Sequence, residues 1–99
     1  MKIFLDDLRE QPEGWILIKD PDEAINLMKL GLVKEISLDH DLGCEKTGYD
    51  VILWIERNVF LENFIPPLIY IHTANPVGYK KIMNALIAIK KEIERKRKR

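Results

Sequence analysis

The alternation of apolar and polar positions divides the chain into short apolar runs and longer amphipathic stretches. Four brief runs, 2–5, 15–19, 35–38 and 68–72, are apolar and are flanked by polar or turn-forming residues. Runs of this length and composition are typical of strands that are buried on both faces of a parallel sheet. The pattern therefore predicts four short strands.

Three longer stretches carry apolar residues at helical spacing. The first begins at Asp20-Pro21, where an aspartate cap precedes a proline at the first helical position, and it ends near Gly31. The second begins near Thr47, and the third begins at Asn75-Pro76 and runs into the nineties. The stripes expected to cover the sheet are Ala24, Ile25, Met28 and Leu32, then Val51, Ile52, Ile55 and Val59, then Ile82, Leu86, Ile89 and Ile93.

The order of the predicted elements is strand, loop, strand, helix, strand, helix, strand, helix. Alternation of this kind favours a parallel sheet with right-handed crossovers, so we expect an α/β fold with strand order 2-1-3-4 and helices on both faces. The first connection, residues 6–14, is shorter than a usual parallel crossover and has no convincing helix. The second strand is therefore either parallel or an antiparallel edge strand.

Length and composition fit one globular domain. The chain has 99 residues, of which 46% are apolar, and domains of this size rarely divide further, so we expect a single domain over residues 1–99. No apolar run approaches the ~20 residues that a membrane helix needs, and the first residues lack the apolar segment of a signal peptide. The expected location is the cytoplasm, without membrane contact. Cys44 is the only cysteine, which excludes an internal disulfide.

Charge is unevenly distributed although the formal net charge is zero. Residues 90–99 contain seven Lys and Arg and two Glu, so the remainder of the chain carries a net charge of −5. A basic helical tail either complements the dipole of its own helix or makes a weak contact with nucleic acid. The sequence leaves both interpretations open, and it does not indicate an oligomeric state.

The polar residues best suited to chemistry follow the predicted strands. Asp6, Asp7 and Arg9 follow the first strand, Asp39-His40-Asp41 follows the third, and His72-Thr73-Ala74-Asn75 follows the end of the fourth. The carboxyl ends of parallel strands converge at one edge of a sheet, and ligands bind there. We therefore expect these side chains, which include both histidines of the chain, to share one pocket.

Three motifs in this order resemble those of a known family. Paired acids after the first strand, Leu38-Asp39 after the third and Thr73-Ala74 after the fourth look like the flavodoxin-like receiver domains of response regulators. A closer match is the group of cyclic-phosphate processing receiver domains, in the motifs Leu5-Asp6-Asp7-Leu8-Arg9, Leu38-Asp39-His40-Asp41-Leu42-Gly43 and His72-Thr73-Ala74-Asn75-Pro76. The chain departs from ordinary receivers because it has no fifth strand with the lysine that contacts the phosphoryl group, and its first helix is reduced to a loop.

The resemblance implies a phosphoesterase that acts on a cyclic phosphate, in a nucleotide or at an RNA end. By match, Asp6 and Asp7 would help to bind a divalent cation such as Mg²⁺, Asp39 would correspond to the phosphoryl acceptor, and Thr73 to the residue that senses the phosphoryl group. The alternative is a non-catalytic or phospho-accepting receiver-like module for signalling or binding.

Opening a cyclic phosphodiester requires a base, an acid and positive charge near the phosphoryl oxygens. His40 and His72 are the expected acid/base pair, in either order, with Asp39 as a further catalytic residue. Crowded carboxylates repel an anion, so the expected cation ligands are Asp6, Asp7, Asp39 and Asp41. The expected phosphate contacts are Arg9, Thr47, Thr73 and Asn75.

Several of these residues also have a purely structural explanation. Thr47 and Asn75 are expected to be helix caps first and ligand contacts second. Arg9 either binds phosphate or forms a salt bridge with Asp6 or Asp41. Tyr49 either stacks on a base or packs against the core.

Overall fold

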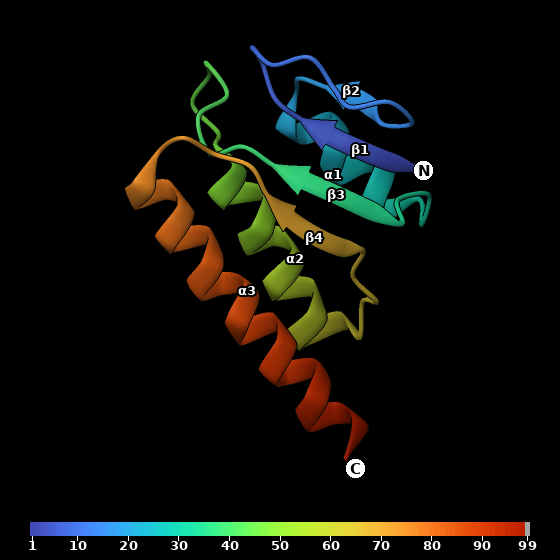
Figure 1. Cartoon of the computed structure of the whole chain (residues 1–99). Helices are drawn as coiled ribbons and strands as arrows, with labels where there is room; N and C mark the ends of the chain where they lie inside the picture. Colours follow the sequence, from blue (N-terminus) through green and yellow to red (C-terminus); the bar gives the residue numbers. More distant parts are fainter. Residues whose placement is uncertain (99) are drawn as a thin grey trace.

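The computed structural model describes residues 1–98, in which four strands and three helices alternate (Figure 1). The elements in chain order are β1 (Lys2–Leu5), β2 (Ile16–Ile18), α1 (Pro21–Lys29), β3 (Glu35–Leu38), α2 (Gly48–Glu62), β4 (Leu68–Ile71) and α3 (Pro76–Arg97). The predicted basic tail forms the last turns of α3, apart from Arg99, which lies outside the described residues. No helix of residues 1–98 is long and apolar enough to cross a membrane.

The four strands form one parallel sheet in the order β2-β1-β3-β4. This confirms the predicted order, and it settles the direction of β2, which pairs parallel to β1 from Ile3↔Ile16 to Leu5↔Ile18. The connection between β1 and β2 contains no helix, which agrees with its short length. The protein therefore has the receiver-like α/β fold that the sequence predicts.

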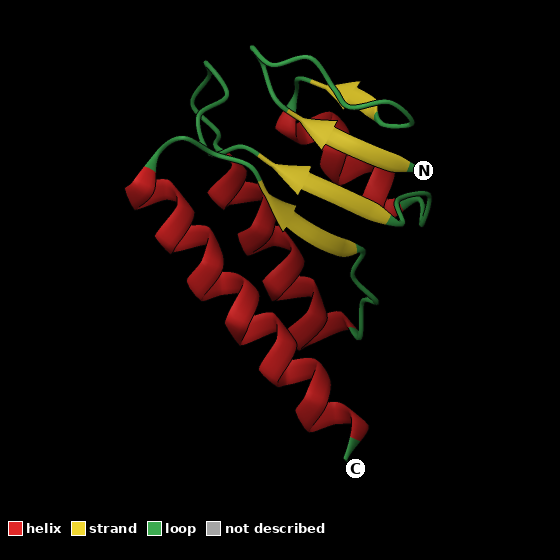
Figure 2. Cartoon of the chain, in the orientation of Figure 1, coloured by secondary structure: helices red, strands yellow, loops and turns green. Residues whose placement is uncertain are grey.

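All three helices lie on one face of this sheet, which differs from the expected cover on both faces (Figure 2). The two crossovers through α1 and α2 run in the same direction across the sheet, and right-handed crossovers of one direction place their helices on one face. α3 then packs along α2. A helix on the other face would have to come from the connection between β1 and β2, which is a loop.

The hydrophobic core fills the space between the sheet and the helices. Ile3, Leu5, Ile36 and Leu38 point from the central strands into this layer and are fully buried. The predicted stripe of α2 is buried throughout, as are Ile82, Leu86 and Ile89 of α3. Leu32, however, is 46% exposed, because α1 ends before it and Gly31 turns the chain with a φ of 73°.

Aromatic side chains cover part of the face that carries no helix. Strand alternation places Phe4 there, and the ring of Trp15 lies edge-on to Phe4 and to Tyr70, with centroid distances of 6.5 and 5.9 Å. The Lys2 ammonium lies 5.7 Å from the centre of the Trp15 ring. The Trp15 indole thus contacts side chains of both β1 and β4, on the face of the sheet that a helix covers in a doubly wound fold.

Candidate functional site

Asp6, Asp39 and His72 lie together beyond the carboxyl ends of three neighbouring strands. Each is the first residue after its strand, and the last strand residues, Leu5, Leu38 and Ile71, are in register. One oxygen or nitrogen of each side chain lies within 4.8 Å of the other two. We call these three residues the acid–imidazole cluster.

The imidazole of His72 is held on three sides. Its Nε2 lies 2.9 Å from Asp6 Oδ2, its Nδ1 lies 2.6 Å from Ser37 Oγ, and the ring stacks on Phe4 with a centroid distance of 3.9 Å. An ionised carboxylate can only accept, so in the neutral ring Nε2 donates to Asp6 and Nδ1 accepts from the Ser37 hydroxyl. The ring orientation is therefore fixed by residues of β1 and β3.

Burial lowers the pKa of His72 from its ordinary value. The hydrogen bond and the negative charge of Asp6, with that of Asp39, act to raise this pKa but do not outweigh the loss of solvation. His72 is therefore neutral at neutral pH, which suits a group that accepts a proton.

Asp6 is completely buried and stays ionised because its oxygens are occupied by donors. Burial acts to raise its pKa, but the backbone N–H groups of Arg9 and Leu8, each 2.8 Å from Oδ1, and the His72 ring together lower the pKa. The two N–H groups belong to the turn that follows β1. The loop that replaces a helix therefore supplies the donors that keep this carboxylate charged.

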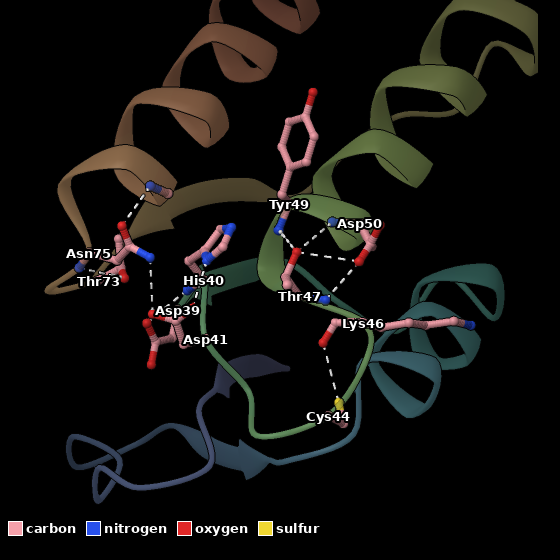
Figure 3. A network of polar contacts seen from close by, with 11 residues as sticks. Asp39, His40, Asp41, Cys44, Lys46, Thr47, Tyr49, Asp50, Thr73 and Asn75 are labelled. Carbon is pink, nitrogen blue, oxygen red and sulfur yellow. Dashed lines mark hydrogen bonds and ion pairs between the residues drawn. The ribbon is translucent and has the colours of Figure 1, made fainter.

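His40 lies apart from the cluster, on the side of the sheet that carries the helices. Its Nδ1 lies 2.9 Å from Asp41 Oδ1 (Figure 3). Its ring is packed so closely against α3 that a Cβ added at Gly78 would lie 2.4 Å from the ring carbon Cγ. His72, in contrast, stacks on Phe4 on the other face. The structure does not bring the two imidazoles together as the expected acid/base pair.

Asp39 and Asp41 have different surroundings, although both were expected to bind a cation. Asp39 accepts the backbone N–H of His40 at 2.7 Å through Oδ1 and belongs to the cluster. Asp41 is exposed, and its pKa is lowered by hydrogen bonds from His40 and from Asn75. Asp41 thus connects the loop after β3 to the start of α3.

Asp7 is also outside the cluster, but one of its oxygens is unusual. Oδ1 is buried and has no hydrogen-bond partner among the described residues. The other oxygen faces Gly43, where an added Cβ would lie 2.7 Å away. A buried carboxylate oxygen without a donor leaves negative charge uncompensated at this corner of the sheet.

The three predicted phosphate contacts that follow β3 and β4 serve as local caps. Thr47 and Asp50 form a reciprocal capping box at the start of α2, and Asn75 Oδ1 accepts the N–H of Gly78 in α3 (Figure 3). Thr73 Oγ1 accepts the N–H of Asn75 at 3.2 Å. Their structural roles are thus visible, and contact with phosphate stays a prediction.

Two further residues have surroundings that bear on the predictions. The Arg9 guanidinium reaches the carbonyl of His72, with Nη1 3.5 Å from the oxygen, and no salt bridge to Asp6 or Asp41 forms within residues 1–98. The ring of Tyr49 packs beside the core, with the Lys81 ammonium 4.8 Å from its centre. Arg9 is therefore beside the cluster, and Tyr49 fits the packing explanation.

Sequence reasoning missed two residues of the site, Ser37 and Phe4. Each lies two positions before a cluster residue, Asp39 and Asp6 respectively, so strand alternation places it on the same face. Ser37 is also polar although it stands between the apolar residues Ile36 and Leu38, and it is almost completely buried. A buried hydroxyl two residues from a candidate catalytic carboxylate was the signal available.

A parallel sheet with an acid pair after β1, an aspartate after β3 and a hydroxyl residue after β4 defines a receiver-type domain. The chain belongs to the family of cyclic-phosphate processing receiver domains, whose model matches residues 1–88. No curated protein and no solved structure is similar enough to the chain to be matched.

Proposed function

We propose that this domain is a phosphoesterase that hydrolyses a cyclic phosphate, in a nucleotide or at an RNA end, at the acid–imidazole cluster. The observation that carries the proposal is the convergence of two carboxylates and one neutral imidazole beyond the carboxyl edge of the sheet. This is the position at which open α/β sheets bind ligands. Membership of the cyclic-phosphate processing family supports the choice of substrate.

A divalent cation fits the donors of the cluster. Asp6 and Asp39 supply carboxylate oxygens, His72 supplies a ring nitrogen, and the unpartnered oxygen of Asp7 leaves excess negative charge nearby. Mg²⁺ prefers ligands that are all oxygen, whereas Mn²⁺ and Zn²⁺ accept imidazole readily, so the donor set favours the latter two over the expected Mg²⁺. A bound cation would offset the charge of the phosphoryl oxygens and polarise the phosphate.

His72 is suited to handle the proton of the attacking water. Its Nε2 faces the carboxylates, while its Nδ1 faces Ser37, whose hydroxyl can donate or accept. When a water molecule or a cation lies between Nε2 and Asp6, Nδ1 can carry the ring proton and donate to Ser37, which leaves the lone pair of Nε2 for the proton of that water or for the cation. Ser37 thus acts as a positioning residue that supports both forms of the ring.

Arg9 is the group best placed to bind the phosphate itself. Its guanidinium carries a permanent positive charge and can hold two phosphoryl oxygens at once. It lies at the carbonyl of His72, with an exposed side chain that is not paired to a carboxylate in the described part of the chain. We assign Arg9 the role of orienting the cyclic phosphate over the cluster.

The test is hydrolysis of 2′,3′-cyclic nucleotides and of an RNA oligomer that ends in a 2′,3′-cyclic phosphate, with Mn²⁺, Zn²⁺, Mg²⁺ or EDTA. Turnover is expected with at least one cation, and Asp39→Asn and His72→Gln are expected to abolish it without unfolding the domain. Glu62→Gln, at the exposed far end of α2, is the matched control. Absence of turnover under every condition would end the proposal.

Two further measurements separate this mechanism from the alternatives. A loss of turnover in His40→Gln as large as that in His72→Gln would restore the mechanism that uses both histidines. Stable labelling of Asp39 by a small phosphodonor, without hydrolysis of any cyclic phosphate, would favour the phospho-accepting module instead.

A further inference from the structure

A second concave region lies at the other end of the strands from the cluster. It is a groove of about 520 Å³ between the start of β4, the segment 63–67 that precedes it, and the second half of α3. Its walls are mainly apolar and include Phe64, Ile65, Leu68, Ile69, Ile89 and Ile93. Ile65 is 88% exposed and Leu68 is 64% exposed, so much apolar surface faces solvent here.

The strand that borders this groove has a free edge. The N–H group of Leu68 donates to the carbonyl of Lys34, just before β3, at 3.0 Å, and that of His72 donates to the carbonyl of Leu38, the last residue of β3, at 2.9 Å. Because alternate residues of a parallel strand bond to opposite sides, the N–H and C=O groups of Ile69 and Ile71 point away from β3. No residue of 1–98 bonds to these groups. An unpaired row of this kind is a template for another strand.

The rim of the groove is basic. Lys90, Lys96 and Arg97 line it from α3. Lys96 is bound to the C-terminal end of α2, at the carbonyl of Val59 and at Asn63 Oδ1. Among residues 1–98, the ion pair of Arg97 is an exposed one with Glu94 at 3.9 Å. Surface pairs of this kind contribute little, so the positive charge of the rim remains available to a partner.

We propose that the β4 edge and this groove bind an extended acidic segment of a partner protein, which adds to the sheet as a fifth strand. Its main chain would pair with Ile69 and Ile71, its alternate apolar side chains would fill the groove towards Ile89 and Ile93, and its carboxylates would meet Lys90 and Arg97. Strand addition of this type takes affinity from main-chain hydrogen bonds and specificity from pockets for alternate side chains.

Charge favours a partner protein over a second copy of this chain. The described residues that line the groove include the cations Lys90, Lys96 and Arg97 and no Asp or Glu. A symmetric pairing of two β4 edges would be antiparallel, and the strand added by the second copy would be Leu68–Ile71, which carries no acidic residue. An acidic strand supplies the complementary charge and buries the same apolar surface.

The probe is a synthetic, end-blocked heptapeptide that alternates Glu with Val or Ile. The matched control peptide has Lys at every Glu position. Fluorescence anisotropy of labelled peptides measures binding to the full chain, and amide spectra with hydrogen exchange report on Ile69 and Ile71. We expect the acidic peptide to bind at least about tenfold more tightly than the lysine peptide, and its affinity to fall as the salt concentration rises. Binding of the acidic peptide should also protect both amides from hydrogen exchange.

Variants separate the edge from the groove. Ile69→Pro removes an outward N–H without removing a hydrogen bond to β3, and edge strands tolerate proline at such positions. Ile69→Ala is the control for the loss of the isoleucine side chain. Ile69→Pro is expected to weaken binding about tenfold more than Ile69→Ala does. Leu68→Asp, which removes apolar surface and adds a like charge, and the pair Lys90→Glu with Arg97→Glu are expected to abolish binding of the acidic peptide. These exposed positions do not endanger folding.

Three results would overturn the inference. Equal binding of the acidic and lysine peptides would remove the role of charge. Peptide binding that leaves the amides of Ile69 and Ile71 unperturbed would remove the added strand. Self-association that Leu68→Asp abolishes, in a chain that does not bind the acidic peptide, would assign the surface to a second copy. None of these outcomes depends on the cluster, because the groove lies at the opposite end of β4.

Discussion

The substitution Ser37→Ala tests how the site orients its imidazole. Ser37 Oγ lies 2.6 Å from His72 Nδ1, and the serine is only 6% exposed. Removing the hydroxyl leaves Nδ1 without a partner. The ring cannot recover by turning its proton to Nδ1, because Nε2 would then face the Asp6 carboxylate lone pair to lone pair. The variant therefore keeps the same tautomer with one buried acceptor unsatisfied.

The expected cost follows from that lost hydrogen bond. A buried polar group left without a partner costs about 1–3 kcal/mol, and the His72 side chain is 15% exposed, so water reaches it in part and the lower half applies. We expect Ser37→Ala to lower the free energy of unfolding by about 1–2 kcal/mol. For a domain of this size that corresponds to a fall in Tm of roughly 5–15 °C.

Urea and thermal unfolding followed by circular dichroism measure this change. Tyr70→Phe is the control, because it removes a hydrogen bond of 3.0 Å to Glu35 on the same sheet face from a residue that is 47% exposed. It should cost less than about 0.5 kcal/mol. Long-range proton–nitrogen spectra of the ring report the tautomer directly. Equal stability of the two variants, with a freely exchanging His72 tautomer, would refute the orientation that we assign to Ser37.

Three further predictions follow from other contacts of the described chain. Burial lowers the pKa of His72 in the folded chain, so the unfolded chain binds the extra proton first as pH falls below about 6.5, and the free energy of unfolding should decline there. His72→Gln should flatten this decline when urea midpoints are measured across pH. Gly78→Ala should lower the free energy of unfolding by about 1–3 kcal/mol in thermal unfolding, because its Cβ would overlap the His40 ring, whereas the exposed neighbour Val77→Ala should lower it little. Unchanged stability of Gly78→Ala would mean that the His40 ring moves freely. Lys96→Met should lower stability by about 1–2 kcal/mol by removing the donor that caps α2, and chemical shifts of the Val59 and Phe60 region should change; an unchanged Tm would contradict this.

The sequence predicted the strands and caps well because these depend on local patterns. Brief apolar runs located all four strands, and Asp20, Thr47 and Asn75 cap the three helices as expected. Membership of the family was also visible in three short motifs, and the family model confirms it. The cover on both faces was predicted wrongly, although the sequence showed no convincing helix in the connection 6–14. That connection is a loop, and the three helices of residues 1–98 all lie on the other face.

The grouping of the histidines shows why site geometry was harder to predict. His72 is the first residue after its strand, whereas His40 is the second after Leu38. Side chains alternate between faces, so this difference of one residue sends the two rings to opposite sides of the sheet. The predicted fourth strand ended one residue late, at His72, so the sequence analysis did not show that the two histidines stand at different distances from the ends of their strands. Local patterns place residues at an edge, but register decides which of them meet.

The missing helix and the surroundings of His72 have one physical origin. A helix over the face of Phe4 would exclude solvent, and a substrate, from the residues beyond it. The loop after β1 instead leaves that face to Trp15 and the Phe4–His72 stack, and it turns two backbone N–H groups towards Asp6. An imidazole after β4 can therefore be held by Ser37 and Asp6 and still be reached from solvent, as its 15% exposed side chain shows. Rebuilding a helix in this connection should bury His72 and close the cluster, which ties the shortened connection to the function that we propose.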